Sequence, residues 1–171
     1  MARTFDRQVE DLGNCIALEH VNTTVPDQRP ATLFYISGLG FTRDPYIQTG
    51  LGNMWVNVGR SQFHLPAKDP QILRGHTAVV TPDREALLAR LSMVKPQLAN
   101  TRFDFVEREA YVEATCPWGN VIRCYAPDAE RFGRIVLGIP YVELNVPVGT
   151  ATPIAAFYQQ AFRTEANVEE D

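Results

Sequence analysis

The sequence predicts an α+β fold in which paired βαβββ modules form one curled mixed sheet around a cleft, followed by a partial third module. Short runs of alternating polar and apolar residues, typical of strands, recur along the chain. In each of the first two modules, one short amphipathic helix lies between such runs. The segment at 20–35 also recurs at 143–158. A shift of 123 positions places Asn22 on Asn145 and one Phe-Tyr pair on another, without a gap. Such a repeat indicates a repeated structural unit.

The composition is that of a globular chain and excludes several classes of function. Of the 171 residues, 45% are apolar and 21% charged, which is enough for a substantial core. A net charge of −4 predicts no nucleic-acid partner. No apolar run predicts a membrane span or a signal peptide. The three cysteines have unrelated spacings and predict buried thiols in the cytoplasm, with a nucleophilic cysteine as the alternative.

A polar arm at 1–14 precedes the first module, which we place at 15–70. It begins with a strand at 16–25 that carries His20 in its middle. A helix at 30–37 follows and ends at a pair of glycines. Strands at 53–58 and 61–65, joined by a two-residue turn, then complete the module.

The second module is placed at 71–127 and begins with a strand at 76–80, which His76 leads. Thr81 is predicted to be the N-cap of the following helix, with Pro82 at its first position. Three strands complete this module, and they are predicted at 103–108, 111–115 and 120–125. Residues 126–137 are predicted to be a linker.

The partial third module is placed at 138–171 and consists of a strand and a helix. Glu143 stands where the first copy has His20. The helix has an apolar stripe that its own unit does not cover, so we expect it to pack on the two modules or on a second copy in a homodimer. A longer four-module protein and a frayed tail are the alternatives.

The order of these elements, with Gly38-Leu-Gly-Phe41 ending the first helix and Cys116-Pro-Trp-Gly119 before the last strand, resembles the vicinal-oxygen-chelate superfamily. This group includes glyoxalase I, extradiol dioxygenases, methylmalonyl-CoA epimerase and the bleomycin and fosfomycin resistance proteins. The resemblance covers about residues 16–127. It implies that the modules curl around a cleft, with a divalent metal where their first and last strands converge.

Carried over by position, the resemblance implies three metal ligands: His20, His64 and His76. The fourth position holds Arg123, where many metal-dependent members have a glutamate. Neutral imidazoles suit iron, zinc, nickel or manganese. The histidine spacing by itself matches no local zinc motif, so histidines that serve only in packing are the alternative.

Substrate-binding candidates are Arg123, Trp55 and Asn57. A guanidinium in the cleft would hold a carboxylate or phosphate, whereas a solvated Arg123 and a packing role for the other two are the alternatives. No catalytic base is assigned. We therefore expect a glyoxalase-like metalloenzyme (a dioxygenase, lyase or isomerase) acting on a small oxygenated, anionic substrate. The alternatives are a metal-free small-molecule binding protein of the bleomycin-resistance type and a structural or regulatory module.

Overall fold

The computed structural model describes residues 17–47 and 52–169 and divides the chain into two compact units. One unit is Leu18–Leu144, and the other includes the C-terminal segment from Asn145. The predicted arm at 1–14 and Cys15 lie outside the described residues. Within the described ranges, no helix is both long and apolar enough to cross a membrane.

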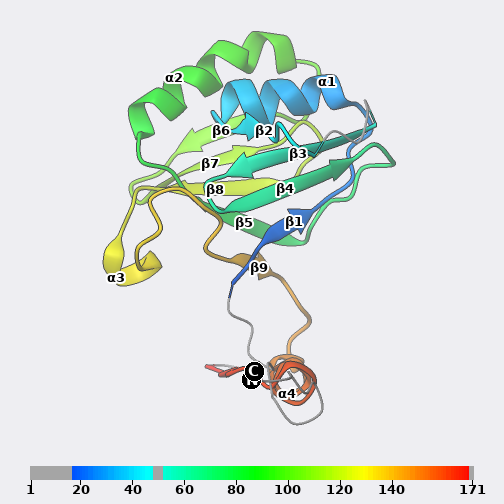
Figure 1. Ribbon diagram of the computed structural model, residues 1–171, viewed down its shortest axis with the longest axis vertical. Coiled ribbons are helices and arrows are strands. Elements are labelled where there is room, and N and C mark those ends of the chain that lie inside the picture. The colour runs from blue at the N-terminus through cyan, green and yellow to red at the C-terminus, as the bar shows by residue number, and fades with distance from the viewer. Residues whose placement is uncertain (1–16, 48–51, 170–171) are drawn as a thin grey trace, which may run out of the picture. The chain divides into compact units, whose positions relative to one another are not determined.

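The first module forms a four-stranded mixed sheet in the order β1-β4-β3-β2 (Figure 1). Its parallel pair is β1 (His20–Asn22) with β4 (Ser61–Pro66). The neighbours β3 (Asn53–Val58) and β2 (Thr42–Arg43) are antiparallel. Side chains of β3 and β4 alternate between buried and half-buried, as the sequence predicts for strands with one covered face.

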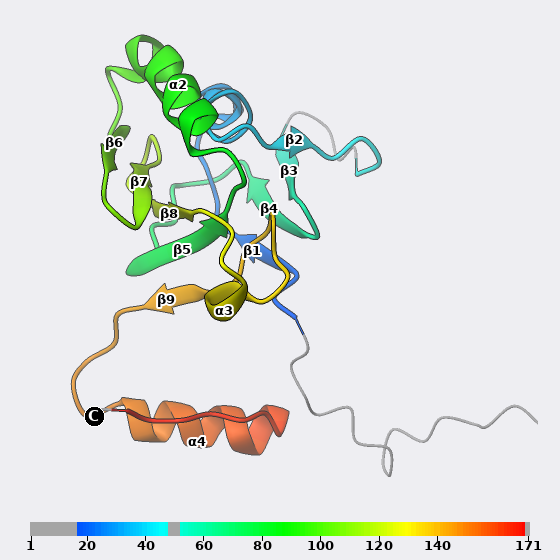
Figure 2. The same cartoon turned by 90° about the vertical axis from the view of Figure 1, so that its left-hand side faces the viewer.

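The second module repeats this topology in a five-stranded sheet, in the order β6-β7-β8-β5-β9 (Figure 2). The parallel pair is β5 (Gly75–Val80) with β8 (Val121–Tyr125). The strands β7 (Tyr111–Thr115) and β6 (Asp104–Glu107) follow antiparallel. The fifth strand is β9 (Val142–Leu144), which pairs antiparallel with the outer edge of β5.

The fold class is confirmed, with one difference in the sheets. The βαβββ order occurs twice, and each first strand pairs parallel with the last strand of its module. Among the described strands, however, no ladder joins β1 to β5, so the modules form two separate sheets instead of one curled sheet.

Two helical segments pack side by side on the sheets. The first is α1 (Gln28–Ala31), which continues as the π-helical η1 (Thr32–Gly38). The second is α2 (Arg84–Val94), followed by the short 3₁₀ helix η2 (Lys95–Leu98). A Cβ on Gly38 would lie 3.3 Å from Val94 Cγ2, so this glycine allows the helices to approach closely.

The predicted start of the second helix is wrong by two residues. The Thr81 amide donates to the Tyr125 carbonyl, so Thr81 directly follows β5 and does not begin the helix. The N-cap is Asp83, whose carboxylate accepts from the Ala86 amide at 2.8 Å.

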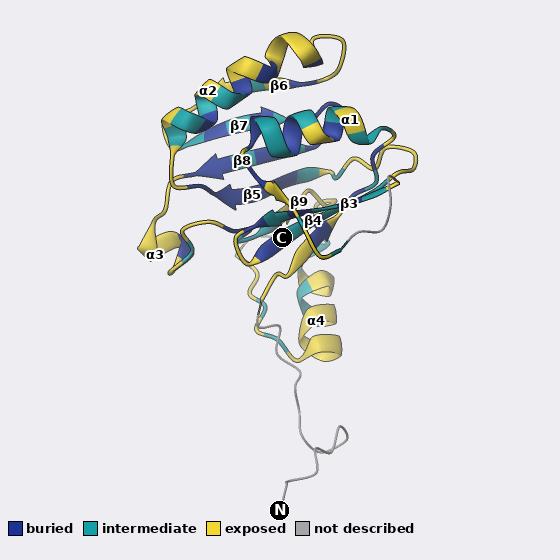
Figure 3. Ribbon diagram, turned by 45° about the horizontal axis from the view of Figure 1, so that its top comes forward, coloured by how far each residue is buried: buried dark blue, intermediate teal, exposed yellow. Residues whose placement is uncertain are grey.

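One continuous core joins the two modules. Side chains from both sheets and both helices are fully buried in it, among them Phe34, Tyr35, Phe63, Leu87, Leu91 and Ile122. Figure 3 shows the buried residues along β5, β7 and β8. Burying one such side chain stabilises a fold by roughly 1.5–3 kcal/mol, so the two modules stabilise each other.

Residues 137–144, called the return segment below, run back across both modules. The predicted linker before it contains a short helix, α3 (Ala129–Phe132), with Asp128 as its N-cap. The Gly138 carbonyl accepts from the Val80 amide at 2.9 Å, and the Ile139 amide donates to Ser61 Oγ at 3.3 Å.

Two glycines with positive φ allow the return segment to pass so closely. A Cβ on Gly59 (φ 63°) would lie 2.0 Å from the Leu137 carbonyl oxygen. A Cβ on Gly75 (φ 144°) would lie 1.9 Å from the Glu143 carbonyl oxygen. No other residue type fits at these two positions without displacing the backbone.

The C-terminal unit contains one helix, α4 (Ala151–Phe162). None of its described residues is buried, and its aromatic side chains contact one another, with Phe157 and Phe162 rings 5.8 Å apart. A strand and a helix thus follow the second module in the predicted order. That they begin a third module remains a prediction.

Candidate functional site

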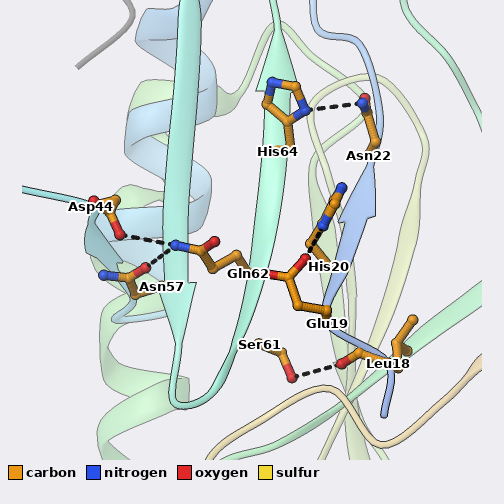
Figure 4. A network of polar contacts seen from close by, with 9 residues as sticks. All are labelled: Leu18, Glu19, His20, Asn22, Asp44, Asn57, Ser61, Gln62 and His64. Carbon is orange, nitrogen blue, oxygen red and sulfur yellow. Dashed lines mark hydrogen bonds and ion pairs between the residues drawn. The ribbon is translucent and has the colours of Figure 1, made fainter. Parts of the chain in front are cut away.

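A pair of histidines lies on the half-exposed face of the first sheet (Figure 4). His20 is on β1 and His64 on the neighbouring β4, and their ring centroids are 6.2 Å apart. Both side chains point away from the core because their strand neighbours Val21 and Phe63 point into it.

A neighbouring side chain holds Nδ1 of each ring. His20 Nδ1 contacts the Glu19 carboxylate, which only accepts, so Nδ1 carries a proton. His64 Nδ1 lies 2.9 Å from Asn22 Nδ2. Turning this amide by 180° presents Oδ1 instead and places a proton on His64 Nδ1 as well. Partners of this kind orient imidazoles for metal binding.

The free nitrogen of His64 is an unusual feature of the site. Its Nε2 is buried and has no hydrogen-bond partner among the described residues. Burial and then the neighbouring His20 lower the pKa of His64, so the ring is neutral at pH 7. A neutral ring with an unpaired nitrogen can accept a proton donor or a metal ion.

Trp55 packs directly on this pair, and Asn57 lies further along the same strand. The Trp55 ring stacks on His64 with centroids 4.0 Å apart and contacts the edge of His20 at 5.2 Å. Asn57 Oδ1 instead accepts from Gln62 Nε2 at 2.6 Å, which also donates to Asp44. Trp55 is therefore part of the histidine site, whereas Asn57 belongs to an adjoining amide network.

His76 occupies the equivalent first-strand position in the second module, but its surroundings differ. The residue is only 3% exposed. Its Nδ1 lies 3.3 Å from Glu143 Oε1, and its Nε2 lies 3.3 Å from the Tyr141 hydroxyl, so the return segment engages both nitrogens. Burial is the main cause that lowers the pKa of His76, followed by the positive charge of Arg123.

The Tyr141 hydroxyl is the centre of this second network. It lies 3.2 Å from the Tyr125 hydroxyl and 3.5 Å from Arg131 Nη2. Burial and the Tyr125 contact raise the pKa of Tyr141 to about 12. The hydroxyl therefore keeps its proton at neutral pH and links the return segment to β8.

Arg123 is the counterpart of His64 in the second module. Each lies on the last strand of its module, two positions beyond the residue that pairs with the first-strand histidine. Its Nε donates to Glu113 Oε2 at 2.9 Å, and its guanidinium lies 5.0 Å from the Tyr111 ring. This hydrogen bond raises the pKa of Arg123. The side chain thus faces its sheet neighbours rather than open solvent, and its charge has a partner.

The structure brings His20, His64 and Trp55 together and places His76 and Arg123 on the other sheet. Within the described part of the chain, no three His, Cys, Asp or Glu side chains are grouped so that they could hold a metal ion. The three-histidine site therefore remains a prediction.

Sequence reasoning did not assign the partners of these residues, which are Glu19, Asn22, Glu113, Tyr141 and Glu143. The identity of Asn22 with Asn145 in the repeat was the available signal for the first site. No periodicity indicates that β9 pairs with β5.

Solved structures share this arrangement of strands and helices, although no family model and no curated protein matches the sequence. A Bacillus anthracis protein described as a glyoxalase family protein gives a TM-score of 0.51 at 17% identity, over 67% of this chain and 97% of its own. The chain has the fold of the vicinal-oxygen-chelate superfamily. A Bacillus subtilis protein described as a dioxygenase gives the same TM-score and identity, over 87% of this chain and 55% of its own.

The vicinal-oxygen-chelate fold places the histidine pair on the first and last strands of a module, the positions that the resemblance predicts for ligands. An identity of 17% shows the shared fold, while the activities in these names belong to the two proteins. The Bacillus subtilis match covers 87% of this chain, which is more than residues 18–144 make up. The match therefore extends beyond the two modules.

Proposed function

We propose that this chain is a metal-dependent enzyme (a dioxygenase, lyase or isomerase) acting on a small oxygenated, anionic substrate. The observation that supports this proposal is the His20–His64 pair, in which protein partners hold both Nδ1 atoms. A divalent ion such as iron, zinc, nickel or manganese, when bound, would polarise neighbouring substrate oxygens.

The predicted third ligand is His76, which would have to leave Tyr141 before its Nε2 could bind a metal. The described residues offer two imidazoles at one place, which is fewer than the three protein donors of a typical catalytic zinc site. A single described chain therefore does not complete the site.

Arg123 supports the choice of an anionic substrate. Glu113 accepts from its Nε, and no hydrogen bond to a described residue occupies its two terminal NH₂ groups. These groups can donate to a second carboxylate or phosphate. A homodimer and a cytoplasmic location are also part of the proposal, and the free buried thiols of Cys116 and Cys124 support the latter.

Metal content tests the proposal directly. Protein purified without chelator should contain a divalent metal, and His20→Ala and His64→Ala should each lower that content at least tenfold. Lys68→Ala on the surface is the control. His76→Gln decides whether the third histidine is a ligand. Turnover of catechol tests ring cleavage, and turnover of a thiol–oxoaldehyde adduct tests lyase or isomerase activity. Absence of metal in the unmodified protein would refute the proposal.

A metal-free small-molecule binding protein is the second candidate. The observation that favours it is that Tyr141 and Glu143 of the return segment occupy both nitrogens of His76. This candidate predicts that EDTA-treated protein binds its ligand as tightly as untreated protein does.

A further inference from the structure

A cluster of aromatic and charged side chains lies on the face of the second sheet on which α3 packs. Tyr111 on β7 is directly opposite Tyr125 on β8, and their rings are 5.2 Å apart. Tyr125 packs with Phe132 of α3 in a small core of its own. A guanidinium group lies over each of the two tyrosine rings. Arg123 is 5.0 Å from the Tyr111 ring, and Arg131 is 4.3 Å from the Tyr125 ring.

Both guanidinium groups are held in place by their neighbours. A hydrogen bond to Glu113 and the ring contact orient the Arg123 side chain. Arg131 contacts a second ring, that of Phe132 at 4.9 Å, and its Nη2 lies 3.5 Å from the Tyr141 hydroxyl. Side chains that are ordered before a ligand arrives lose less entropy when they bind it.

The two arginines differ in how their charges are balanced. Arg123 forms an ion pair with Glu113 through Nε, which leaves its terminal NH₂ groups without a described hydrogen-bond partner. Arg131 is exposed and forms no ion pair with any described residue. Glu143, the other carboxylate of this network, contacts His76 instead. One positive charge therefore has no described counterpart, and both arginines keep N–H groups that a ligand can reach.

The two guanidinium groups occupy neighbouring places on one face of the sheet. Arg123 and Tyr125 are two positions apart on β8, so their side chains point to the same side and their Cα atoms are about 7 Å apart. Arg131 lies over that Tyr125 ring. Two cations placed in this way repel each other, and an anion between them removes the repulsion.

We propose that Arg123 and Arg131 together bind the phosphate group of a small phosphomonoester. A phosphate has three terminal oxygens and close to two negative charges, so it can accept from two guanidinium groups at once. One carboxylate, in contrast, matches a single guanidinium fork. The Tyr125 and Tyr141 hydroxyls lie 3.2 Å apart beside Arg131, where a hydroxyl can donate to the same anion.

This site is separate from the His20–His64 pair. Arg131 comes from α3, which lies outside both βαβββ modules, so the strands of the modules alone do not form the site. The inference names the anionic group of the substrate and to that extent rests on the proposed function. Phosphate binding itself requires neither a metal nor the histidine pair, so the two proposals can fail separately.

Titration calorimetry of the full chain with inorganic phosphate tests the site at neutral pH and physiological ionic strength, where distant charges are screened. We expect one phosphate per chain, and Arg131→Gln should weaken its binding at least tenfold, because it removes charge-assisted hydrogen bonds. Arg134→Gln is the matched control, since it removes the same charge from another exposed arginine near α3 and should change the affinity less than twofold. His20→Ala should retain phosphate binding. Circular dichroism checks that each variant folds.

Two further measurements test the geometry and the class of ligand. Arg123→Lys keeps the positive charge but loses the guanidinium fork, and it should weaken phosphate binding at least threefold. Acetate is the carboxylate probe, and it should bind the unmodified protein at least tenfold more weakly than phosphate does.

Each other outcome overturns a stated part. Equal losses in Arg131→Gln and Arg134→Gln indicate general charge attraction and refute the site, as does loss of phosphate binding in His20→Ala. Two phosphates per chain refute a site shared by both arginines. Acetate that binds as tightly as phosphate refutes the ligand class. If no phosphate binds, this inference is wrong, whereas metal content that depends on the histidine pair would still support the proposed function.

Discussion

The two modules share one topology, yet the faces that carry their histidines differ. In the first module the equivalent positions hold His20 and His64, and the edge of β1 is open among the described residues. In the second they hold His76 and Arg123, and β9 covers the edge. The first face is a histidine pair in which the His64 ring is neutral and its Nε2 has no described partner. The second is a network of ion pairs and hydroxyl groups that engages both nitrogens of His76.

This difference shows that one added strand can change the chemistry of a site. Glu143 and Tyr141 contact both nitrogens of His76, and Glu113 neutralises Arg123. Each of these contacts replaces a hydrogen bond that water would make to the same side chain on an uncovered face. Four changes to the chain test this difference between the two faces.

The largest effect is expected at Gly75, because its replacement removes the cover from the second face. In Gly75→Ala the new Cβ would lie 1.9 Å from the Glu143 carbonyl oxygen, so β9 must move away. We expect the free energy of unfolding to fall by about 3 kcal/mol, measured in urea. Gly133→Ala is the control, since Gly133 has a φ of 62° but no atom within 4 Å of the new Cβ. Its loss should be only about 1 kcal/mol. Equal losses would contradict the role of the clash.

The Arg123–Glu113 pair should give the next largest effect. Arg123→Met leaves a partly buried carboxylate without its partner, and a loss of about 1–2 kcal/mol in unfolding free energy is expected. The matched variant is the double change Arg123→Met with Glu113→Gln, which should recover part of the loss. If the double variant is as unstable as the sum of the two single changes, the pair contributes nothing to stability.

Two substitutions should convert the second face into a copy of the first. Arg123→His together with Tyr141→Phe creates a histidine pair at the positions of His20 and His64 and releases His76 Nε2 from its hydroxyl partner. Titration calorimetry with zinc should show an additional binding event. Arg123→His alone is the control, and it should bind less zinc because Tyr141 still contacts His76. Tyr141→Phe alone should lower stability by about 1 kcal/mol.

The smallest effect is the pH dependence that His76 adds. Its folded pKa lies below the unfolded value of 6.5, so the unfolded chain binds more protons in acid. Stability should therefore fall as the pH drops through 6.5 and level off below the folded pKa. His76→Gln should flatten part of this slope in denaturation series between pH 8 and 5. An unchanged slope would show that His76 titrates alike in both states.

The sequence predicted those elements whose pattern is local. The strands at 53–58, 61–65 and 111–115 alternate cleanly, and the structure has them within one residue. The helix start at Thr81 was predicted wrongly because the N-cap rule reads a local motif, whereas the bond from the Thr81 amide to Tyr125 at the end of β5 is non-local. The short α3 escaped prediction because four residues have no periodicity.

For the site, positions were predictable and contacts were not. The strand and turn order identified where His20 and His64 lie in their module. What each ring contacts depends on pairings between distant segments, such as His76 with Glu143, and one sequence contains no signal for these.

The return segment also imposes an order on biosynthesis. Ile139 bonds to Ser61 and Gly138 to Val80, so these contacts form only after both modules have been translated. At roughly 5–20 residues per second, the ribosome needs a further one to four seconds to pass from Tyr125 to Leu144. During that interval the nascent chain has an exposed β5 edge, and a chaperone that binds unpaired strands would have its best opportunity there.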